Sequence, residues 1–378
     1  MNCLKPDSIS LCMVVKNEEK LIGQCLRNMR AVVNEMVVID TGSTDNTINI
    51  AKKYGAHVIR YRWDGSLGRA RNEYLKNAVS PWILVLDADE RIAKKDLPKL
   101  KKMVNDDSAL GYVFDRRDYT KTYDLMRQWR PNDGRYPAEE KFSRCPGWSL
   151  TSYIRLFRRK EGIRYDEGYS AHTDFSESLK RHKGKIKKCD IIMHHFQFLK
   201  GDDFIIKKQK DRLKYEIQHI RMFPNNAWSY LNIGITFFSL GNDANAVKYL
   251  KKAVKINPKF DMAYFVLGMV YKEALRYDDS ICALKKAIRM DPKNADAWAV
   301  LGMVYDCKNL LSDAEDALRK AVTINPFHLL AHNSLGIVYE EQGKFKDAEK
   351  EYKKAIRIHP QYPNVRNNLK DLYRRTDL

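Results

Sequence analysis

In the C-terminal third of the chain, hydrophobic and small residues recur at a constant interval. This interval equals the distance in sequence between Pro258 and Pro292. A proline, a glycine, an alanine and an aromatic residue return at the same places in each period: Pro258, Pro292, Pro326 and Pro360; Gly234, Gly268, Gly302 and Gly336; Ala253, Ala287, Ala321 and Ala355; Phe237, Tyr271, Tyr305 and Tyr339. Glycine lets two helices approach closely, and proline cannot continue a helix. The period therefore predicts four helical hairpins over residues 225–360, and a polar helix over 361–378 that caps the stack.

The N-terminal part of the chain has a different pattern, in which short apolar runs alternate with amphipathic segments. The apolar runs are rich in β-branched residues and have the length of buried strands: Ile9–Val15, Met36–Ile39 and Trp82–Leu86. Helical patterns separate them, at Glu19–Ala31, Thr47–Tyr54 and Ala70–Asn77. Strands that alternate with helices predict a parallel, doubly wound α/β sheet over residues 1–200. Ligands of such sheets bind at the carboxyl ends of the strands.

The composition is that of a folded protein with two or more domains. Of the 378 residues, 44% are hydrophobic and 31% are charged. No apolar run reaches the roughly 18 residues of a membrane helix, and the first residues lack the apolar stretch of a signal peptide. The seven cysteines are an odd number without a CxxC pair, so we expect reduced cysteines and a cytoplasmic protein.

The net charge of +20 is concentrated before the repeats. Residues 180–224 contain 13 Lys and Arg against 5 Asp and Glu, and their second half, 201–224, is predicted to be a basic helical linker. This charge is compatible with a solvated helix face, with peripheral contact to anionic lipids or with phosphorylated substrates. Nucleic acid is not an expected partner, because no motif that reads RNA or DNA accompanies the charge.

A cluster of polar residues follows each of the three predicted strands. The clusters are Val15-Lys16-Asn17-Glu18, Asp40-Thr41-Gly42-Ser43-Thr44-Asp45 and Asp87-Ala88-Asp89-Glu90. Carboxylate oxygens are the ligands that hard divalent cations prefer, and such a cation neutralises charge on a diphosphate. The carboxyl edge of the sheet is therefore the candidate site.

Three clusters in this order resemble the family 2 glycosyltransferases of the GT-A fold. The resemblance implies a metal-assisted, inverting transfer from a nucleotide sugar, with a UDP-sugar as the expected donor. It assigns the nucleotide sugar to Val15, Asn17, Glu18, Asp40, Gly42, Ser43, Asp45, Arg71, Asp87 and Ala88. Asp87 and Asp89 match the D-x-D of the family, which holds Mn²⁺ or Mg²⁺ against the two phosphates. The family usually has Asp-Phe a few residues before this arginine, where this chain has Ser66-Leu67, so the identity of the nucleotide base stays open. Arg71 would reach the phosphate or the base of the nucleotide; alternatively, it caps a helix or pairs with Glu73.

A narrower resemblance, to lipopolysaccharide-core and glycocin peptide glycosyltransferases, concerns the general base and a further metal ligand. His195 matches a strand-end histidine of that subgroup and is implied as a metal ligand, with His194 as the alternative. The subgroup has a His-Glu pair where this chain has His172-Thr173. Threonine cannot accept a proton near neutral pH, so Asp174 and His172 are the candidate catalytic bases, and Glu177 and Glu167 stay open. A thiol acceptor would need a weaker base.

The repeats resemble tetratricopeptide (TPR) repeats in their period and in their pattern of small and aromatic residues. By family position, their concave face would carry Leu231, Ile235, Phe265, Met269, Met303 and Ile337. An apolar face of this kind is expected to have a partner: a protein, peptide or glycan acceptor, the catalytic domain, or a second copy in a homo-oligomer.

Two other functions of the chain remain open. One is an inactive scaffold that binds nucleotide sugar and a protein partner, and the other is a nucleotidyltransferase. The latter usually has a glycine-rich, basic first loop, which Val14–Glu19 lacks.

Overall fold

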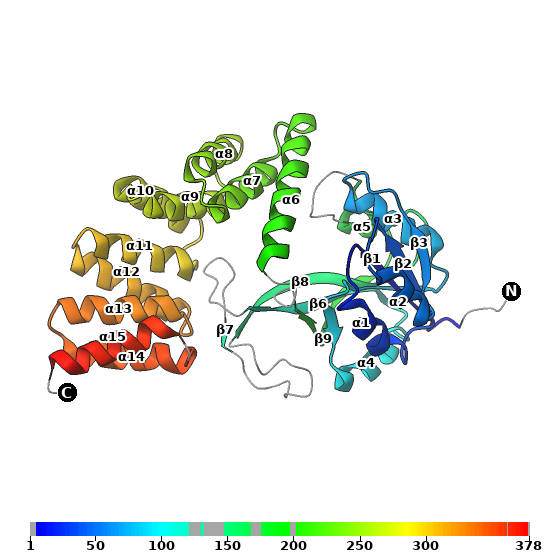
Figure 1. Cartoon of the computed structure of the whole chain (residues 1–378), viewed down its shortest axis with the longest axis horizontal. Helices are drawn as coiled ribbons and strands as arrows, with labels where there is room; N and C mark the ends of the chain where they lie inside the picture. Colours follow the sequence, from blue (N-terminus) through cyan, green and yellow to red (C-terminus); the bar gives the residue numbers. More distant parts are fainter. Residues whose placement is uncertain are drawn as a thin grey trace. The chain divides into compact units, whose positions relative to one another are not determined.

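The computed structural model describes residues 5–120, 130–131, 147–167, 175–196, 202–360 and 362–376 (Figure 1). The chain divides into two compact units. Unit 1 consists mainly of residues 1–119 and 150–200, and unit 2 mainly of residues 201–378. No helix among the described residues has both the length and the apolar character needed to cross a bilayer.

A mixed sheet with helices on both faces forms unit 1. Its strands are β1 (Ile9–Val15), β2 (Glu35–Asp40), β3 (His57–Arg60), β4 (Trp82–Val85), β5 (Glu90–Ile92), β6 (Ala109–Thr120), β7 (Arg130–Pro131), β8 (Gly147–Arg158) and β9 (Lys185–His195). They are ordered β3-β2-β1-β4-β8-β6-β9-β5, and β7 pairs with β8. The helices are α1 (Ile22–Met29), α2 (Thr47–Lys53), α3 (Leu67–Asn77), the 3₁₀ turn η1 (Lys94–Asp96), α4 (Leu97–Met103) and α5 (Ser176–Lys180).

The parallel sheet expected from the sequence is correct only for its first half. Strands β3, β2, β1 and β4 are parallel, because α1, α2 and α3 supply the crossovers that parallel neighbours need. Beyond β4, β8 pairs with it in the antiparallel direction, and so does β5 with β9. The purely parallel expectation was wrong for β8 and β5, since antiparallel neighbours need no crossover helix, whereas β6 and β9 are again parallel.

Alternation along the strands separates two apolar layers. On β1, Ile9 and Leu11 belong to the layer that includes α1 and α4, whereas Cys12 belongs to the layer that includes α3. Both layers are dry, since these three side chains are at most 1% exposed. A sheet covered on both faces leaves the ends of its strands as the place where polar side chains can meet.

Besides β7 and the first residues of β8, which belong to unit 2, the described part of unit 2 from residue 202 onward consists of helices. They are α6 (Asp202–Met222), α7 (Ala227–Ser239), α8 (Asp243–Ile256), α9 (Asp261–Glu273), α10 (Tyr277–Met290), α11 (Ala295–Cys307), α12 (Leu311–Ile324), α13 (Leu329–Glu341), α14 (Phe345–Ile358) and α15 (Pro363–Arg375). The recurring glycines allow each hairpin to close: a Cβ atom on Gly268 would lie 2.5 Å from Cγ of Leu284, and one on Gly302 equally close to Leu318. The expected α/β domain followed by an all-α repeat array is confirmed.

The stretch expected to be a linker is an ordered helix that packs on the first hairpin. In α6, His219 shares a hydrogen bond with Ser229 Oγ of α7 (2.8 Å), and Glu216 Oε1 accepts one from Asn232 Nδ2 (3.2 Å). Arg221 stands one full repeat before Lys255, so the end of α6 is in phase with the second helices of the hairpins. The helix therefore acts as the second helix of an incomplete first repeat.

Two residues expected on the concave face of the array lie in its core instead. Leu231 and Phe265 are each 1% exposed and pack among the other apolar side chains of the repeats. Ile235, Met269 and Ile337 are partly buried against the same core. The expectation of an apolar groove was wrong for the first two, because neighbouring hairpins cover their side chains.

Candidate functional site

Hydrogen bonds from backbone N–H groups to side-chain oxygens join the loops of the first two polar clusters. Asn17 has the left-handed φ of 55° that asparagine tolerates, and its Oδ1 accepts a hydrogen bond from the backbone N–H of Thr44 (2.8 Å). The N–H of Asn17 donates in turn to Ser43 Oγ (2.9 Å). Asp45 accepts bonds from the N–H groups of Thr47 (3.0 Å) and Glu19 (3.2 Å). The two loops therefore form one rigid ledge at the ends of β1 and β2.

Asp40, which ends β2, holds the turn that follows it. Its carboxylate accepts hydrogen bonds from the backbone N–H groups of Gly42 and Ser43, at 3.1–3.3 Å. Gly42 has a φ of 101°, which a residue with a Cβ would rarely adopt. Asp40 is only 2% exposed, as is Val15, whereas Asn17 and Gly42 are exposed. The surface of the ledge is thus formed by Asn17 and Gly42, with Asp40 beneath.

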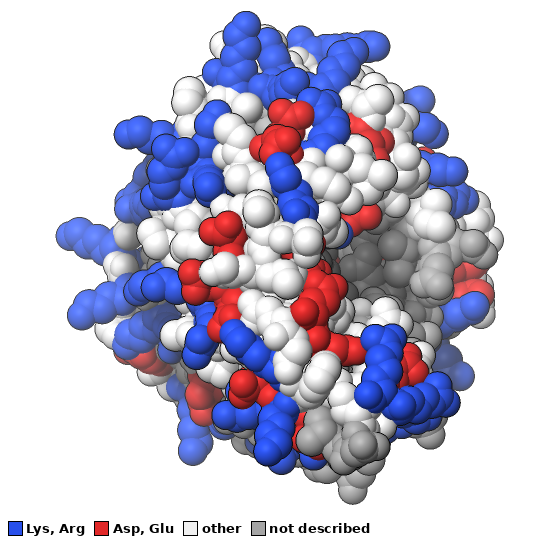
Figure 2. All heavy atoms as spheres, turned by 90° about the vertical axis from the view of Figure 1, so that its left-hand side faces the viewer, with Lys and Arg blue, Asp and Glu red and all other residues white. Residues whose placement is uncertain are grey.

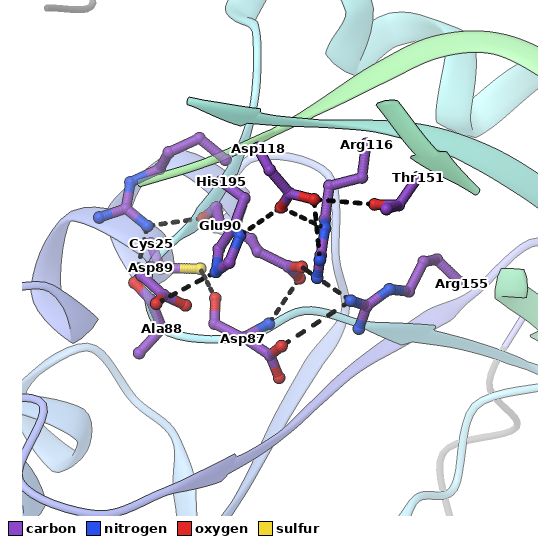
Figure 3. A network of polar contacts seen from close by, with 11 residues as sticks. Cys25, Asp87, Ala88, Asp89, Glu90, Arg116, Asp118, Thr151, Arg155 and His195 are labelled. Atoms are coloured by element: carbon purple, nitrogen blue, oxygen red, sulfur yellow. Dashed lines mark hydrogen bonds and ion pairs between the residues drawn. The ribbon is translucent and has the colours of Figure 1, made fainter. Parts of the chain in front are cut away.

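The third cluster surrounds a buried glutamate. Glu90 is fully buried and accepts hydrogen bonds from Arg155 Nη2 (2.7 Å), Arg116 Nη1 (3.1 Å) and the backbone N–H of Asp87 (2.9 Å). Arg155 also lies 3.8 Å from the carboxylate of Asp87, whose side chain is 38% exposed. Two arginines from β6 and β8 therefore converge on the loop after β4 (Figure 3).

His195 connects Asp89 with a carboxylate on a neighbouring strand. Its Nδ1 lies 2.5 Å from Asp118 Oδ1 and its Nε2 lies 3.3 Å from Asp89 Oδ2 (Figure 3). Asp118 also binds Arg116 Nε (2.9 Å) and accepts a hydrogen bond from Thr151 Oγ1 (3.0 Å). The sheet register explains the meeting, since β9 places His195 opposite Asp118 of β6 and opposite Glu90 of β5.

Charge in the network shifts the pKa values of His195 and Asp87. Burial alone would lower the pKa of His195, but the carboxylates of Asp89 and Asp118 outweigh it and raise the pKa to about 9. Burial would raise the pKa of Asp87, yet the nearby guanidinium groups of Arg155 and Arg71 lower it. Asp87 is therefore an ionised carboxylate near neutral pH, open on one side.

Arg71, on α3, lies among aromatic rings. Its guanidinium carbon is 5.2 Å from the centre of the Tyr165 ring. The neighbouring Asn72 donates to Glu167 Oε1 (3.0 Å) and to the carbonyl of Tyr165 (3.1 Å). Glu73 pairs with Lys76 at 3.0 Å. Arg71 and Asn72 thus join α3 to residues 165–167, and the charge of Arg71 acts on Asp87.

The two adjacent histidines of β9 have different environments. His194 is fully buried and shares a hydrogen bond with Tyr119 Oη (2.9 Å). The rings of His194 and Tyr119 are stacked, with their centres 5.8 Å apart. His195, on the opposite face of the strand, is in the acidic network. The geometry therefore favours His195 over His194 as the histidine of the site.

Comparison with known families agrees with this arrangement. Residues 10–162 match the family described as Glycosyl transferase family 2. Residues 227–260, 265–328 and 330–362 match families described as Tetratricopeptide repeat. The chain carries a family 2 glycosyltransferase domain followed by TPR repeats.

Several curated proteins are similar to parts of this chain. A TPR repeat-containing protein of Synechococcus elongatus is 31% identical over 168 residues, 44% of this chain and 36% of that protein. The SPbeta prophage-derived glycosyltransferase SunS of Bacillus subtilis is 25% identical over 250 residues, 65% of this chain and 53% of that protein. An uncharacterized glycosyltransferase of Rickettsia conorii is 30% identical over 115 residues, 30% of this chain and 40% of that protein. The chain therefore spans about a third to a half of the length of these relatives.

Three residues of the glycosyltransferase domain belong to the site although the sequence did not single them out: Arg116, Asp118 and Arg155. Arg116 and Asp118 are two apart on β6, so they face the same side of a strand that is otherwise largely buried. Arg155 lies between Ile154 and Leu156 on β8. The run of four charged residues, Asp115 to Asp118, within an otherwise apolar strand was a readable signal of a buried polar network.

The candidate catalytic bases cannot be placed in this geometry. His172, Thr173 and Asp174 lie outside the described residues, as does the side chain of Glu177. Of the candidates, only Glu167 is described, and it bonds to Asn72 on α3. The roles of His172 and Asp174 stay predictions.

The donor set of the glycosyltransferase domain suits a divalent cation that arrives with a diphosphate. Among the described residues, no three His, Cys, Asp or Glu side chains already form a group able to hold a metal ion. Cations in nucleotide sites commonly take only one or two carboxylates, and phosphate oxygens and water complete their shell. Asp87, ionised and partly exposed, and Asp89, next to His195, fit that pattern.

Proposed function

We propose that this chain transfers a sugar from a nucleotide donor, with a UDP-sugar as the first candidate, to a peptide, protein or glycan acceptor, with inversion and with Mn²⁺ or Mg²⁺. One observation carries the proposal: the acidic loop after β4, Asp87 to Glu90, lies between Arg116, Arg155 and His195. This juxtaposition of carboxylates and fixed cations suits a ligand that combines a diphosphate with a metal ion.

In the proposed function, Asp87, Asp89 and His195 would hold the cation. Because a metal ligand must be deprotonated, His195 would give up the proton on Nε2, which faces Asp89, while Nδ1 keeps its bond to Asp118. When bound, the cation would neutralise the negative charge that develops on the departing nucleoside diphosphate. The charges of Arg71 and Arg155, which already lower the pKa of Asp87, would act on the same phosphates. Glu90 keeps Arg116 and Arg155 in place, and since it is fully buried it does so without contacting the donor.

The nucleotide would lie on the ledge at the ends of β1 and β2. Asn17, Glu18 and Gly42 are the accessible members of the predicted set, and Ser43 and Asp45 hold the two loops together. Asp40 supports this surface through Gly42 and Ser43. Val15 and Ala88 also belong to the predicted set, but both are at most 3% exposed, so they would lie beneath the nucleotide and contribute least to its contact.

The acceptor would be deprotonated by Asp174 or His172, and its oxygen or sulfur would attack the anomeric carbon from the face opposite the leaving diphosphate. In that step the bond from the acceptor to the sugar forms, the bond from the sugar to the diphosphate breaks, and the proton passes to the base. A protein or peptide acceptor, held by the TPR repeats, agrees with the use of such repeats as interaction surfaces. A homo-oligomer and a cytoplasmic site of action belong to the same proposal.

The proposal is tested by hydrolysis of a panel of nucleotide sugars with and without Mn²⁺. We expect one donor to be hydrolysed only with the metal, and Asp89→Asn to lose both that hydrolysis and metal-dependent donor affinity in calorimetry. Asp190→Asn is the matched control, because Asp190 is an exposed carboxylate on β9 that pairs with Lys99 (2.6 Å) away from the network. Donor affinity that is equal in both variants and independent of Mn²⁺ would contradict the proposed metal role.

A further inference from the structure

One edge of the TPR array collects the connections that lead from each hairpin to the next. These connections, 223–226, 257–260, 291–294 and 325–328, follow α6, α8, α10 and α12. Because hairpins in a solenoid stack in the same orientation, equivalent connections lie along one edge. We call residues 221–228, 255–260, 289–294, 323–328 and 357–360 the loop edge.

Large apolar side chains on the loop edge are exposed to solvent. The exposed fraction is 62% for Trp228, 53% for Phe327 and 50% for Phe223, and Met222 and Met290 are also exposed. Residues 222–228 line an open hollow. One of them, Trp228, packs on Phe260, with the two ring centres 4.7 Å apart. Several exposed aromatic residues on one edge indicate an interaction surface rather than a defect of packing.

Basic side chains recur on the same edge with the period of the repeats. One repeat position is occupied by Arg221, Lys255, Arg289 and Arg357, and another by Lys259 and Lys293. These six side chains are exposed. Within the loop edge the acidic residue is Asp291, which is half-buried and accepts a hydrogen bond from the backbone N–H of Lys293 (3.0 Å). Asp261, directly after the edge, is half-buried as well.

A second basic row lies one turn further inside the same helices. It consists of Lys251, Lys252, Lys285, Lys286, Arg319, Lys320, Lys353 and Lys354. Acidic residues instead gather in the first turns of these helices, at the opposite edge: Asp243, Asp278, Asp279, Asp313 and Asp347. On the face shown in Figure 2, Lys and Arg side chains project over much of the periphery, and Asp and Glu gather nearer the middle. In the second row, Arg319, Lys353 and Lys354 form ion pairs with Glu315, Glu349 and Glu351 of the same helices. At the opposite edge, Asp278 and Asp279 pair with Lys308 and Arg276. The excess of basic charge is therefore greatest on the loop edge.

We propose that the loop edge docks on the surface of a membrane that contains anionic lipids. Exposed Trp, Phe and Met side chains can enter the headgroup region, while Lys and Arg on the same edge reach lipid phosphates. Binding of this kind needs both apolar contact and charge, and the loop edge supplies both in each of several repeats. An extended row suits a surface rather than a small ligand. The inference goes beyond sugar transfer and does not depend on it.

Charge is tested by sedimentation of the full chain with two kinds of vesicle, one of phosphatidylcholine alone and one of two parts phosphatidylcholine to one part phosphatidylglycerol. We expect binding to the anionic vesicles only. Each basic residue near such a surface contributes about fivefold in affinity, so the triple variant Lys255→Gln, Arg289→Gln, Lys293→Gln should bind on the order of 100-fold more weakly. The control is the triple variant Lys248→Gln, Lys346→Gln, Lys350→Gln, which removes the same charge from exposed sites further from the edge. Salt screens the attraction of these distant charges to the membrane, so this variant should bind like the wild type.

Apolar contact is tested separately. Phe223→Ser with Phe327→Ser should weaken binding on the order of tenfold or more, as expected when two exposed aromatic rings no longer enter the headgroups. The control, Leu275→Ser with Phe345→Ser, changes exposed apolar residues of the opposite edge and should have no effect. The fluorescence of Trp228 should shift to shorter wavelength when anionic vesicles are added. Its signal is obtained by subtracting the spectrum of Trp228→Phe from that of the wild type.

Several outcomes would overturn the proposal. These are equal binding to neutral and anionic vesicles, no binding to either, an equal loss of binding in the control variants, and an unchanged Trp228 signal when vesicles are bound. Binding of single-stranded nucleic acid that depends on Lys255, Arg289 and Lys293, without any vesicle binding, would assign the edge to a different partner and would likewise overturn it.

Discussion

At the scale of single residues, a connected set of buried charges stabilises the candidate site. Arg116 bridges Glu90 and Asp118, Arg155 bridges Glu90 and Asp87, and His195 joins Asp118 to Asp89. Removing one member of such a set leaves its partners buried and unpaired, which costs more than the loss of an exposed pair. The network therefore fixes the loop after β4 before any ligand binds.

The first residue-scale prediction concerns Glu90. Glu90→Gln keeps the shape of the side chain but leaves Arg116 and Arg155 facing a neutral amide. We expect a loss of about 3 kcal/mol in the free energy of unfolding, measured by urea denaturation. Glu73→Gln, which breaks the outer ion pair with Lys76, should cost less than about 0.5 kcal/mol. Equal stability of the two variants would show that the buried set contributes no more than an exposed pair.

The adjacent histidines allow a matched second prediction. His195→Ala should weaken nucleotide-sugar binding on the order of 10- to 100-fold in calorimetry with Mn²⁺, as loss of a group at a metal site typically does. His194→Ala should lower the melting temperature through its lost contacts with Tyr119 and leave donor affinity close to that of the wild type. The reverse pattern would exchange the roles assigned to the two residues.

At the scale of elements, residues brought together by neighbouring helices or strands determine what each element can do. In the TPR array, Asp306 on α11 lies near Glu341 at the end of α13, one repeat later. Burial and the neighbouring charge of Glu341 raise the pKa of Asp306 to about 6. The two helices therefore pack best when one of these carboxyl groups is protonated.

The element-scale prediction follows from the sign of this shift. The pKa of Asp306 is higher in the folded chain than the roughly 3.9 of an unfolded one, so the folded state binds the proton more tightly. Stability from this group is present below about pH 4 and is lost as the pH rises to about 6. Asp306→Asn should therefore raise the melting temperature at pH 8 more than at pH 4. The control Asp313→Asn, at an exposed position, should change the melting temperature little at either pH. An equal rise in melting temperature at pH 4 and pH 8 for Asp306→Asn would show that the pKa of Asp306 is not raised.

At the scale of the whole molecule, the boundary between the units decides how the chain can be divided. Gly201–Leu378 belongs to unit 2, so α6 is part of the repeat array and not a free connector. Glu216, 1% exposed, and His219, 5% exposed, bond to Asn232 and Ser229 of α7. A cut after α6 would expose these buried polar groups, whereas a cut before it would not.

Two truncations test this boundary and the role of the repeats. A fragment of residues 1–200 should hydrolyse the nucleotide sugar but lose transfer to a protein acceptor. A fragment of residues 1–224 should be less soluble and more easily cleaved by protease within 201–224, because α6 has lost α7. Transfer by the 1–200 fragment at the rate of the full chain would exclude the repeats as the acceptor site.

The sequence by itself determined what local periodicity encodes. The constant period of the repeats specified the hairpins from Asn225 to Pro360, and three apolar runs specified β1, β2 and β4 to within one residue at each end. The polar clusters after those strands pointed to the carboxyl edge of the sheet, since strand ends in an α/β sheet share one edge. Such features depend on residues close together in the chain.

Only the tertiary structure decided what depends on pairing between distant segments. Arg116 and Arg155 meet Glu90 from 26 and 65 residues away, and His195 meets Asp118 from 77 residues away. Strand direction beyond β4, the choice between His194 and His195, and the place of α6 in the array follow from the same long-range packing. A local pattern shows that a segment is a strand or a helix, but its register against a distant partner is set by which side chains can be buried together.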